Sequence, residues 1–276
     1  LGTNVTPNVG DLVKNVKYKS GVITFKTPDT FKEGNAVIAA KDANGKILWS
    51  WHIWLTDQPQ EQVYYNDAGT MMDRNLGATS ATPGDVGALG LLYQWGRKDP
   101  FLGYCSISDE IESKSTITWP SSVESTSSTG TIAYATANPT TFITINLINN
   151  DWYYVGYHFI SSESTDNTRW TTSDKAKSIY DPCPAGWRVP DGGSNGVWSK
   201  ALGSSIDFTY KSLCDSSEGK NFSGRFSSDQ IIWYPLSSNL EYYDGSIRGE
   251  CDRDCICGDY WSASPSNYGV YHLSFD

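Results

Sequence analysis

Alternating apolar and polar positions dominate the first part of the chain and predict short β-strands. Val22–Phe25 alternates, and Ala36–Ala40 is a short apolar run. In the run Lys46–Leu55, one face carries Ile47, Trp49, Trp51, Ile53 and Leu55, and the other carries Leu48, Ser50, His52 and Trp54. Because both faces carry bulky side chains, we expect this strand to pack against more than its hairpin partner.

Turn and boundary signals divide the chain. Asn44-Gly45 is a hairpin turn signal between two of these predicted strands. The first 15 residues read as a linker or as a remnant of a preceding domain, and the polar, proline-containing stretch Asp57–Glu61 reads as a boundary. We therefore expect an N-terminal linker and β-hairpin unit over residues 1–57, packed on the remainder, and a main domain over residues 58–276.

The main domain begins with another predicted hairpin, in which Val63–Tyr65 and Met71–Met72 flank a turn at Asn66–Gly69. Leu89–Trp95 then predicts a short helix or strand. A Ser/Thr-rich stretch at about 106–146 predicts an insertion of surface loops and short strands, with Thr141–Ile145 as its apolar anchor.

The rest of the chain predicts more strands than helices. A helix is expected over Gly196–Leu202, with Ser194 as N-cap and Gly203 as the stop signal. Strands are expected at 150–155, 231–235, 239–243, 260–262 and 269–275. The predicted fold class is α+β, dominated by β-structure.

The decapeptide Asp181–Pro190 contains three prolines, which fix φ and remove three backbone donors. A helix or central strand is therefore excluded there. Cys183 and Trp187 lie among the prolines, and we expect both to be buried, so that the segment forms a rigid, pinned loop.

Four ordered segments resemble the major-paralogous-domain (FISUMP) family, found in surface proteins of Gram-negative anaerobes. They are Met72–Ala78, Gly90–Phe101, Asp181–Pro190, and Tyr260–Ser264 followed by Tyr271–Phe275. The resemblance covers roughly residues 62–276 and implies a C-type-lectin-like domain with long loop insertions. The residues expected to hold this framework are Trp95, Cys183, Trp187, Arg188 and Trp261.

The resemblance does not extend to the sugar chemistry of calcium-dependent lectins. Those proteins hold calcium with a Glu-Pro-Asn or Gln-Pro-Asp tripeptide and a Trp-Asn-Asp strand, whereas Tyr260-Trp-Ser-Ala263 stands here. Trp261 is accordingly expected to be a core residue only. A second relative of the fold, the formylglycine-generating oxidase, uses a cysteine pair, but its Arg-Gly-Gly-Ser-type segment is missing.

The composition of the chain narrows the classes of partner that it can bind. The net charge is −10, which disfavours nucleic acid and anionic lipid. No apolar run approaches the roughly 18–20 residues needed to cross a bilayer. The chain starts at Leu1, so we expect any targeting signals to lie upstream, and we expect an extracellular or outer-membrane surface location.

The six cysteines are an even set that fits disulfides in an exported protein: Cys105, Cys183, Cys214, Cys251, Cys255 and Cys257. Spacing cannot choose among the 15 connectivities that six cysteines allow. On one strand the side chains of Cys255 and Cys257 would point the same way, about 6–7 Å apart, which makes them a poor mutual pair. We expect Cys183 to have a partner elsewhere.

Catalytic signals are weak. His52, His158 and His272 each lie in a strand-like aromatic context, without a nucleophile elbow or a phosphate-binding glycine motif. Glu250, Asp252 and Asp254 alternate, so on a strand their carboxylates would share one face and suit a calcium ion. The alternative that we favour is a disulfide-stapled hairpin with a solvated acidic face. A zinc site at Cys251, Cys255 and Cys257 would need a fourth ligand.

Aromatic residues beside polar ones are the best signals for binding. The candidate ligand-binding residues are Trp233, Tyr234, Tyr242, Tyr243, Asp244 and Arg248. Strand alternation predicts that one of Tyr242 and Tyr243 points inward. These signals and the resemblance favour a non-catalytic adhesion or ligand-binding module, such as a fimbrial tip component, that contacts a host or matrix glycan or protein. A structural subunit that contacts sister subunits is the alternative, and an enzyme is a third. No cofactor is expected, calcium at the acidic residues excepted.

Overall fold

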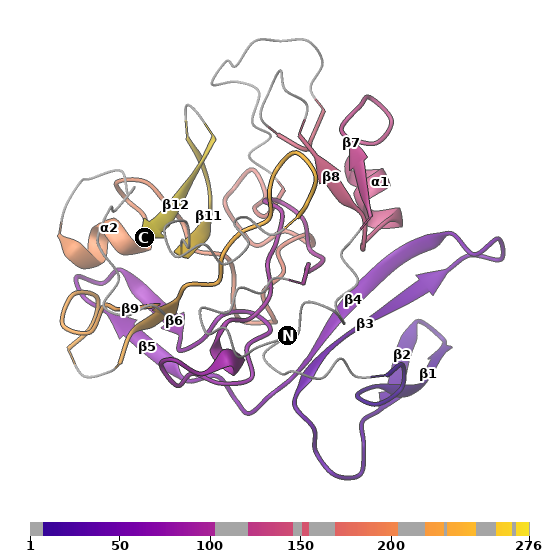
Figure 1. The fold of residues 1–276 in the computed structure, drawn as a ribbon, viewed down its shortest axis with the longest axis horizontal. Helices are drawn as coiled ribbons and strands as arrows, with labels where there is room; N and C mark the ends of the chain where they lie inside the picture. Colours follow the sequence, from indigo (N-terminus) through magenta and orange to yellow (C-terminus); the bar gives the residue numbers. More distant parts are fainter. Residues whose placement is uncertain are drawn as a thin grey trace.

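The computed structural model describes residues 8–102, 121–145, 151–154, 169–203, 219–228, 231–246, 258–266 and 269–275. Within these ranges the fold is dominated by β-structure with few short helices (Figure 1). The strands pair into two-stranded sheets, all antiparallel except the parallel pair β7–β8. The predicted β-dominated α+β class is confirmed at this level.

Two hairpins form the N-terminal part. β1 (Lys14–Lys19) pairs with β2 (Val22–Lys26), and β3 (Gly34–Lys41) pairs with β4 (Ile47–Leu55). In the first turn Ser20 and Gly21 both have positive φ, as a two-residue turn between antiparallel strands requires. The predicted linker over the first 15 residues is wrong from residue 12 onward, because Leu12 and Val13 are buried and Lys14 begins β1.

The face of β4 that carries Ser50 and Trp54 contacts later parts of the chain. The buried Ser50 hydroxyl donates to Asp99 over 2.5 Å, and Lys98 donates to the Ser50 carbonyl over 3.0 Å. The Trp54 indole N–H donates to the Ala78 carbonyl. The expectation that this strand packs against more than its hairpin partner is therefore confirmed.

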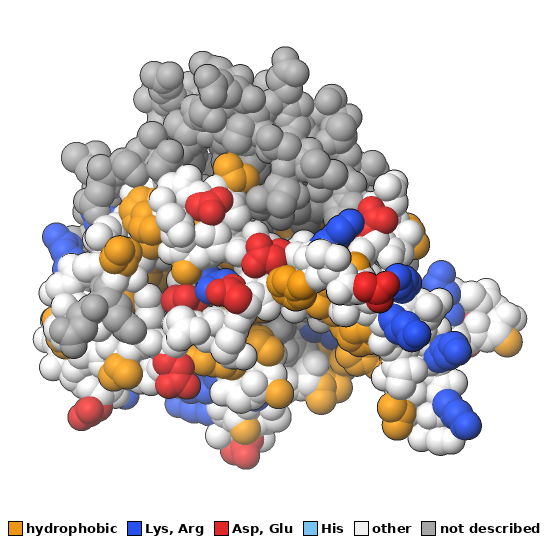
Figure 2. Space-filling view, turned by 90° about the horizontal axis from the view of Figure 1, so that it is seen from below, with side chains coloured by type: hydrophobic (Ala, Val, Ile, Leu, Met, Phe, Trp, Pro, Cys, Tyr) orange, Lys and Arg blue, Asp and Glu red, His pale blue; other side chains and the backbone are white. Residues whose placement is uncertain are grey.

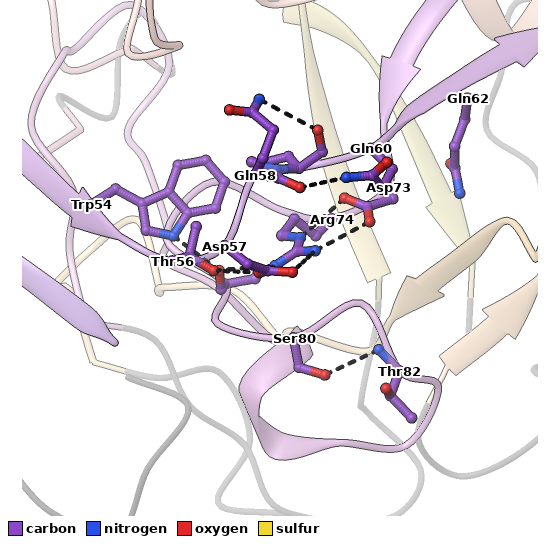
Figure 3. Close-up of polar contacts among 12 residues, drawn as sticks. Trp54, Thr56, Asp57, Gln58, Gln60, Gln62, Asp73, Arg74, Ser80 and Thr82 are labelled. Atoms are coloured by element: carbon purple, nitrogen blue, oxygen red, sulfur yellow. Dashed lines mark hydrogen bonds and ion pairs between the residues drawn. The ribbon is translucent and has the colours of Figure 1, made fainter. Parts of the chain in front are cut away.

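Arg74, which follows β6 (Gly69–Met72), links this part of the chain to the residues that follow β4 (Figure 3). Its guanidinium bonds the carboxylates of Asp57, at 2.5 Å, and Asp73, at 2.9 Å. Burial acts to lower the pKa of Arg74, but the hydrogen bonds that it donates to the two carboxylates outweigh burial and raise that pKa. The bond from Arg74 also lowers the pKa of the exposed Asp57. The polar stretch after β4 is therefore tied to the residues after β6.

The central part of the fold contains short elements separated by turns. They are β5 (Glu61–Tyr64), β6 (Gly69–Met72), the 3₁₀ turn η1 (Val86–Ala88), β7 (Ser122–Glu124), α1 (Ile132–Ala137) and β8 (Phe142–Thr144). β5 and β6 form the predicted hairpin, and Asn66 and Asp67 both take positive φ in its turn. The predicted helix or strand at Leu89–Trp95 is wrong: Leu92 makes only an isolated bridge to Phe101.

The described part of the predicted insertion, residues 121–145, contains the expected short strands, β7 and β8, and in addition the helix α1, which was not predicted. The anchor prediction is confirmed, because Phe142 and Ile143 are buried. Ala135 of α1 and Trp152 join Ile143 in a small core. Trp152 lies in a bend, so the predicted strand over residues 150–155 is wrong at residues 151–154.

The C-terminal part supplies the largest core. It contains α2 (Val197–Leu202), β9 (Gly219–Asn221), β10 (Trp233–Pro235), β11 (Gly258–Ser266) and β12 (Gly269–Phe275). The strand predictions at 260–262 and 269–275 are confirmed, and the one at 231–235 is confirmed from Trp233 onward. Buried aromatic residues of this core stack on one another, including Tyr64, Phe222, Phe226 and Phe275.

Two local predictions in this part need correction. α2 ends at Gly203, whose φ of +63° confirms the stop signal, but its N-cap is Gly196, without a side-chain cap, and not Ser194. Residues 239–243 do not form the predicted strand. Glu241 instead accepts from Gly245 and donates to Ser246 through its backbone, which closes a turn.

Candidate functional site

The four sequence segments quoted above converge on one cavity of about 570 Å³. Each contributes several lining side chains, among them Arg74 and Asn75, Tyr93 and Trp95, Trp187 and Arg188, and Trp261 and His272. The β5–β6 hairpin, β10 and Tyr242 complete the wall. The segments are far apart in the sequence, so only the folded chain creates this groove.

The β11–β12 hairpin divides its side chains between the core and the groove. Tyr260 pairs with Leu273 on the face that joins the large core. Trp261 pairs with His272, and because alternate residues of a strand share a face, Asp259 lies on the same face as Trp261. Asp259, Trp261 and His272 all line the groove. One face of this hairpin therefore stabilises the fold, and the other is available to a ligand.

Trp261 is the most prominent aromatic residue of the groove. Its side chain is 39% exposed, so the expectation that it serves only the core is wrong. The indole N–H donates to the Tyr93 carbonyl over 2.9 Å, and the ring lies 5.9 Å from that of His272. The bond satisfies the polar atom and fixes the ring, so the indole face can stack on a flat or apolar group.

Polar groups lie beside this indole. The Asp259 carboxylate accepts from the Asn239 amide over 2.8 Å. The nearest approach of His272 Nε2 to that carboxylate is 3.9 Å, too long for a direct hydrogen bond. A carboxylate, an amide and an imidazole provide both donors and acceptors, as recognition of hydroxyl groups requires. The arrangement suits binding of a polar ring-shaped ligand.

The proline-rich loop forms another wall, and Asp181 organises it. Its buried carboxylate accepts from the backbone N–H groups of Cys183 and Val189, both over 2.8 Å, and pairs with Lys177 at 2.6 Å. The Pro190 carbonyl accepts from Ala263 of β11. The loop contains neither helix nor strand, as predicted, and it is held by the contacts of Asp181.

The sulfur chemistry of this loop differs from the prediction. Cys183 carries a free thiol, so the expected disulfide partner is wrong for this residue. Burial raises the pKa of Cys183 well above its ordinary value, which makes the thiol a poor nucleophile. Trp187 and Cys183 are only half-buried, contrary to the expected full burial, and Arg188 pairs with Asp191 at the rim of the loop.

Behind the groove, an aromatic and basic cluster supports the segment around Trp95. Trp95 is buried and donates to the Ser262 carbonyl. The Arg169 guanidinium lies 4.2 Å from the Trp95 ring and pairs with Asp151 at 2.6 Å. Burial lowers the pKa of the neighbouring Arg97 to about 10. These contacts fix the backbone that carries Tyr93.

The predicted ligand-binding residues have different positions in the structure. Tyr234 is mainly a core residue, since its hydroxyl bonds Tyr64 and accepts from Trp198, but it also lines the groove, and its role in ligand binding stays a prediction. Trp233 is half-buried in the groove wall, and its indole nitrogen has no hydrogen-bond partner among the described residues. Asp244 accepts from Ser246 and closes a turn.

The tyrosine pair is also different from the prediction. Tyr242 and Tyr243 are 54% and 58% exposed, so neither points inward as strand alternation predicted. The two rings contact each other edge to face, at 5.4 Å between centroids. Only Tyr242 of the pair lines the groove. The pair occupies the turn that replaces the predicted strand.

Several predicted residues lie outside the described residues. They are Arg248, the calcium candidates Glu250, Asp252 and Asp254, and the cysteines other than Cys183. Over the described ranges, no three His, Cys, Asp or Glu side chains gather in a way that could hold a metal ion. The calcium, zinc and remaining disulfide expectations therefore stay predictions.

The sequence reasoning missed Asp259, Asn239 and Tyr93 as groove residues. The sequence contains a signal for Asp259. Leu273 and Phe275 are apolar and alternate, which places His272 and Ser274 on the opposite face of their strand. Asp259 pairs with Ser274 and therefore lies on that same face. Tyr93 contributes a backbone carbonyl, for which the sequence has no signal.

No protein-family model, curated protein or solved structure that was compared matches this chain. No helix in the described part of the chain is both long enough and apolar enough to span a membrane. The resemblance to the major-paralogous-domain family stays a prediction from the sequence motifs.

Proposed function

We propose that this chain is a non-catalytic ligand-binding module of an extracellular or outer-surface adhesin-like protein, with a glycan as its ligand. The groove is the binding site. The observation that carries the proposal is the half-exposed Trp261 indole, fixed by Tyr93 and flanked by Asp259 and His272. Apolar walls with a few convergent polar groups are typical of ligand sites.

The chemistry of the groove favours a glycan within the predicted class of host or matrix partners. A sugar ring has an apolar face of C–H groups, which can stack on an indole, and hydroxyl groups at its edge. Asp259 can accept from a hydroxyl, and the Asn239 amide and His272 imidazole add further donors and acceptors. Tyr242 adds a second exposed ring at the groove.

A glycan array and a host-protein pull-down test this proposal with the intact chain. We expect Trp261→Ala to weaken binding to the best array ligand at least about tenfold, because truncating a central aromatic residue of a binding site commonly costs about 2 kcal/mol or more. Phe31→Ala is the matched control: it removes an exposed aromatic ring that does not line the groove. Equal binding by Trp261→Ala and the parent chain would contradict the proposal.

The second candidate function is a structural subunit of a surface appendage. It is favoured by the β1–β2 hairpin, a two-stranded sheet whose first strand is exposed throughout. Exposed edges of this kind can accept an added strand from a sister subunit. Sedimentation velocity over a range of concentrations distinguishes the candidates, since an assembly subunit forms oligomers and the binding module stays a monomer.

A further inference from the structure

A second surface, separate from the groove, lies on the β1–β2 hairpin. The pairing places Lys14 opposite Lys26, Lys17 opposite Thr24 and Lys19 opposite Val22. Residues opposite each other lie on the same face of a sheet, and so do residues two apart on a strand. Lys14, Lys17, Lys19 and Lys26 therefore share one face, here called the lysine face.

The lysine face has a charge that the protein does not balance. All four lysines are exposed, and none of them makes an ion pair within the described ranges. Residues 12–26 contain these four lysines and no Asp or Glu. Lys14 and Lys26 lie directly opposite, where like charges repel. A bound anion would relieve this repulsion.

The charge is also segregated over the whole chain. Residues 1–57 contain seven Lys and five Asp or Glu, a net +2, whereas residues 58–276 contain 14 Lys or Arg and 26 Asp or Glu, a net −12. Figure 2 shows Lys and Arg side chains gathered at the end of the molecule where Figure 1 places β1 and β2. An acidic molecule thus presents one basic, projecting surface.

We propose that the lysine face binds a linear acidic polysaccharide through its sulfate or carboxylate groups. The face is only two strands wide, about 5 Å between strands, and lysines two apart on a strand are about 7 Å apart. A single extended polyanion fits this width. A DNA duplex needs a broader basic surface, because phosphates of both its strands have to be neutralised.

The opposite face of the hairpin argues against a membrane as the partner. Tyr18 pairs with Ile23 there, and Phe25 lies on the same face by alternation. Tyr18 is 75% exposed and Phe25 38%. The apolar rings and the ammonium groups thus point in opposite directions, so they cannot contact one bilayer surface together. The polyanion proposal needs only the lysine face.

Fluorescence anisotropy with a labelled heparin oligosaccharide tests the proposal on the intact chain. The test variant is Lys17→Gln with Lys19→Gln, and the control is Lys175→Gln with Lys200→Gln, which removes the same charge from exposed sites outside the hairpin. We expect the test variant to bind about tenfold more weakly and with a shallower salt dependence. We expect the control to stay within about twofold of the parent chain.

Three outcomes would overturn the inference: absence of heparin binding by the parent chain, equal losses in both variants, or equally tight binding of duplex DNA or of vesicles rich in phosphatidylserine. Neutral dextran should not compete. The lysine face and the groove are separate, so Trp261→Ala should leave heparin binding unchanged. Failure of one proposal can therefore be distinguished from failure of the other.

Discussion

At the scale of single residues, the environment of a side chain decides its role more than its type does. Trp233 and Tyr234 are adjacent aromatic residues that both line the groove, yet Tyr234 is buried and doubly hydrogen-bonded, while the Trp233 indole nitrogen has no hydrogen-bond partner among the described residues. Strand alternation separates them, and the sequence shows that alternation. It does not show which face of β10 meets the core, because that depends on Tyr64 and Trp198, distant in the sequence.

His52 gives the fold a dependence on pH. Burial between Asn35 and Tyr93 lowers the pKa of His52 from 6.5 to about 4. Between pH 6.5 and pH 4 the unfolded chain binds a proton at His52 that the native state does not. The contribution of His52 to the free energy of unfolding is therefore fully present above pH 6.5 and is lost as the pH falls toward 4. The expected loss is about 3 kcal/mol.

Urea unfolding of His52→Gln and the parent chain at pH 7 and pH 4.5 measures this loss. We expect the difference between the two pH values to be smaller in His52→Gln than in the parent chain. His272→Gln is the matched control, because it removes an imidazole that lies on the groove face, away from Asn35 and Tyr93. An unchanged difference in His52→Gln would show that His52 does not titrate as described.

Two glycines with similar φ angles allow the cost of backbone strain to be distinguished from the cost of steric crowding. Gly96 has φ +82° and Gly186 has φ +85°. A Cβ at Gly96 would lie 2.6 Å from Arg169 side-chain atoms, whereas a Cβ at Gly186 would have nothing within 4 Å. We expect Gly186→Ala to cost about 1 kcal/mol from backbone strain and Gly96→Ala about 1–3 kcal/mol more. Thermal unfolding checks this, and equal costs would refute the close packing at Arg169.

At the scale of elements, the hairpins were predictable and the irregular segments were not. The strands around Gly45 and around Asn66 follow from alternation and turn residues, which are local signals. Tyr242 and Tyr243 favoured a strand by their intrinsic preference, but Gly245, with φ +79° and Phe142 close by, belongs to a turn. The contact with Phe142 is a tertiary one, so local pattern could not reveal it.

The buried ion pair of Arg74 with Asp73, which holds the guanidinium that also bonds Asp57 after β4, can be tested against an exposed pair. The Arg74 and Asp73 side chains are 4% and 11% exposed, whereas those of Arg188 and Asp191 are 38% and 41% exposed. We expect Arg74→Gln to destabilise the fold by about 2–3 kcal/mol, since it leaves the Asp73 carboxylate without its cation. Arg188→Gln should cost at most about 1 kcal/mol.

Chemical denaturation of the two variants, with the parent chain as reference, measures both costs. A cost for Arg74→Gln no larger than that for Arg188→Gln would mean that the link contributes little to stability. High salt should reduce the contribution of the exposed Arg188 pair more than that of the buried one.

At the scale of the whole molecule, the groove arises from four segments that the sequence singles out separately. Their apolar and proline-rich character predicted a rigid framework, and Asp181 and Arg74 supply contacts that hold it. The sequence could not predict that Trp261 would be exposed, because the exposure depends on how the β11–β12 hairpin faces the loop that carries Tyr93.

Basic and acidic residues are also segregated over the whole molecule. The basic hairpin and the acidic remainder are separate in the sequence, so their segregation could be read from it. The single lysine face could not, because it depends on the irregular register between Lys14 and Lys17. Together the two surfaces give one chain two sites with different ligand chemistry.

The central claim, that the groove holds a ligand against Trp261, is tested most directly by a crystal structure of the chain with its tightest-binding glycan from the array. We expect electron density for a sugar ring stacked on the Trp261 indole, with a hydroxyl within hydrogen-bond distance of Asp259. A ligand bound elsewhere, with the groove empty, would contradict the account.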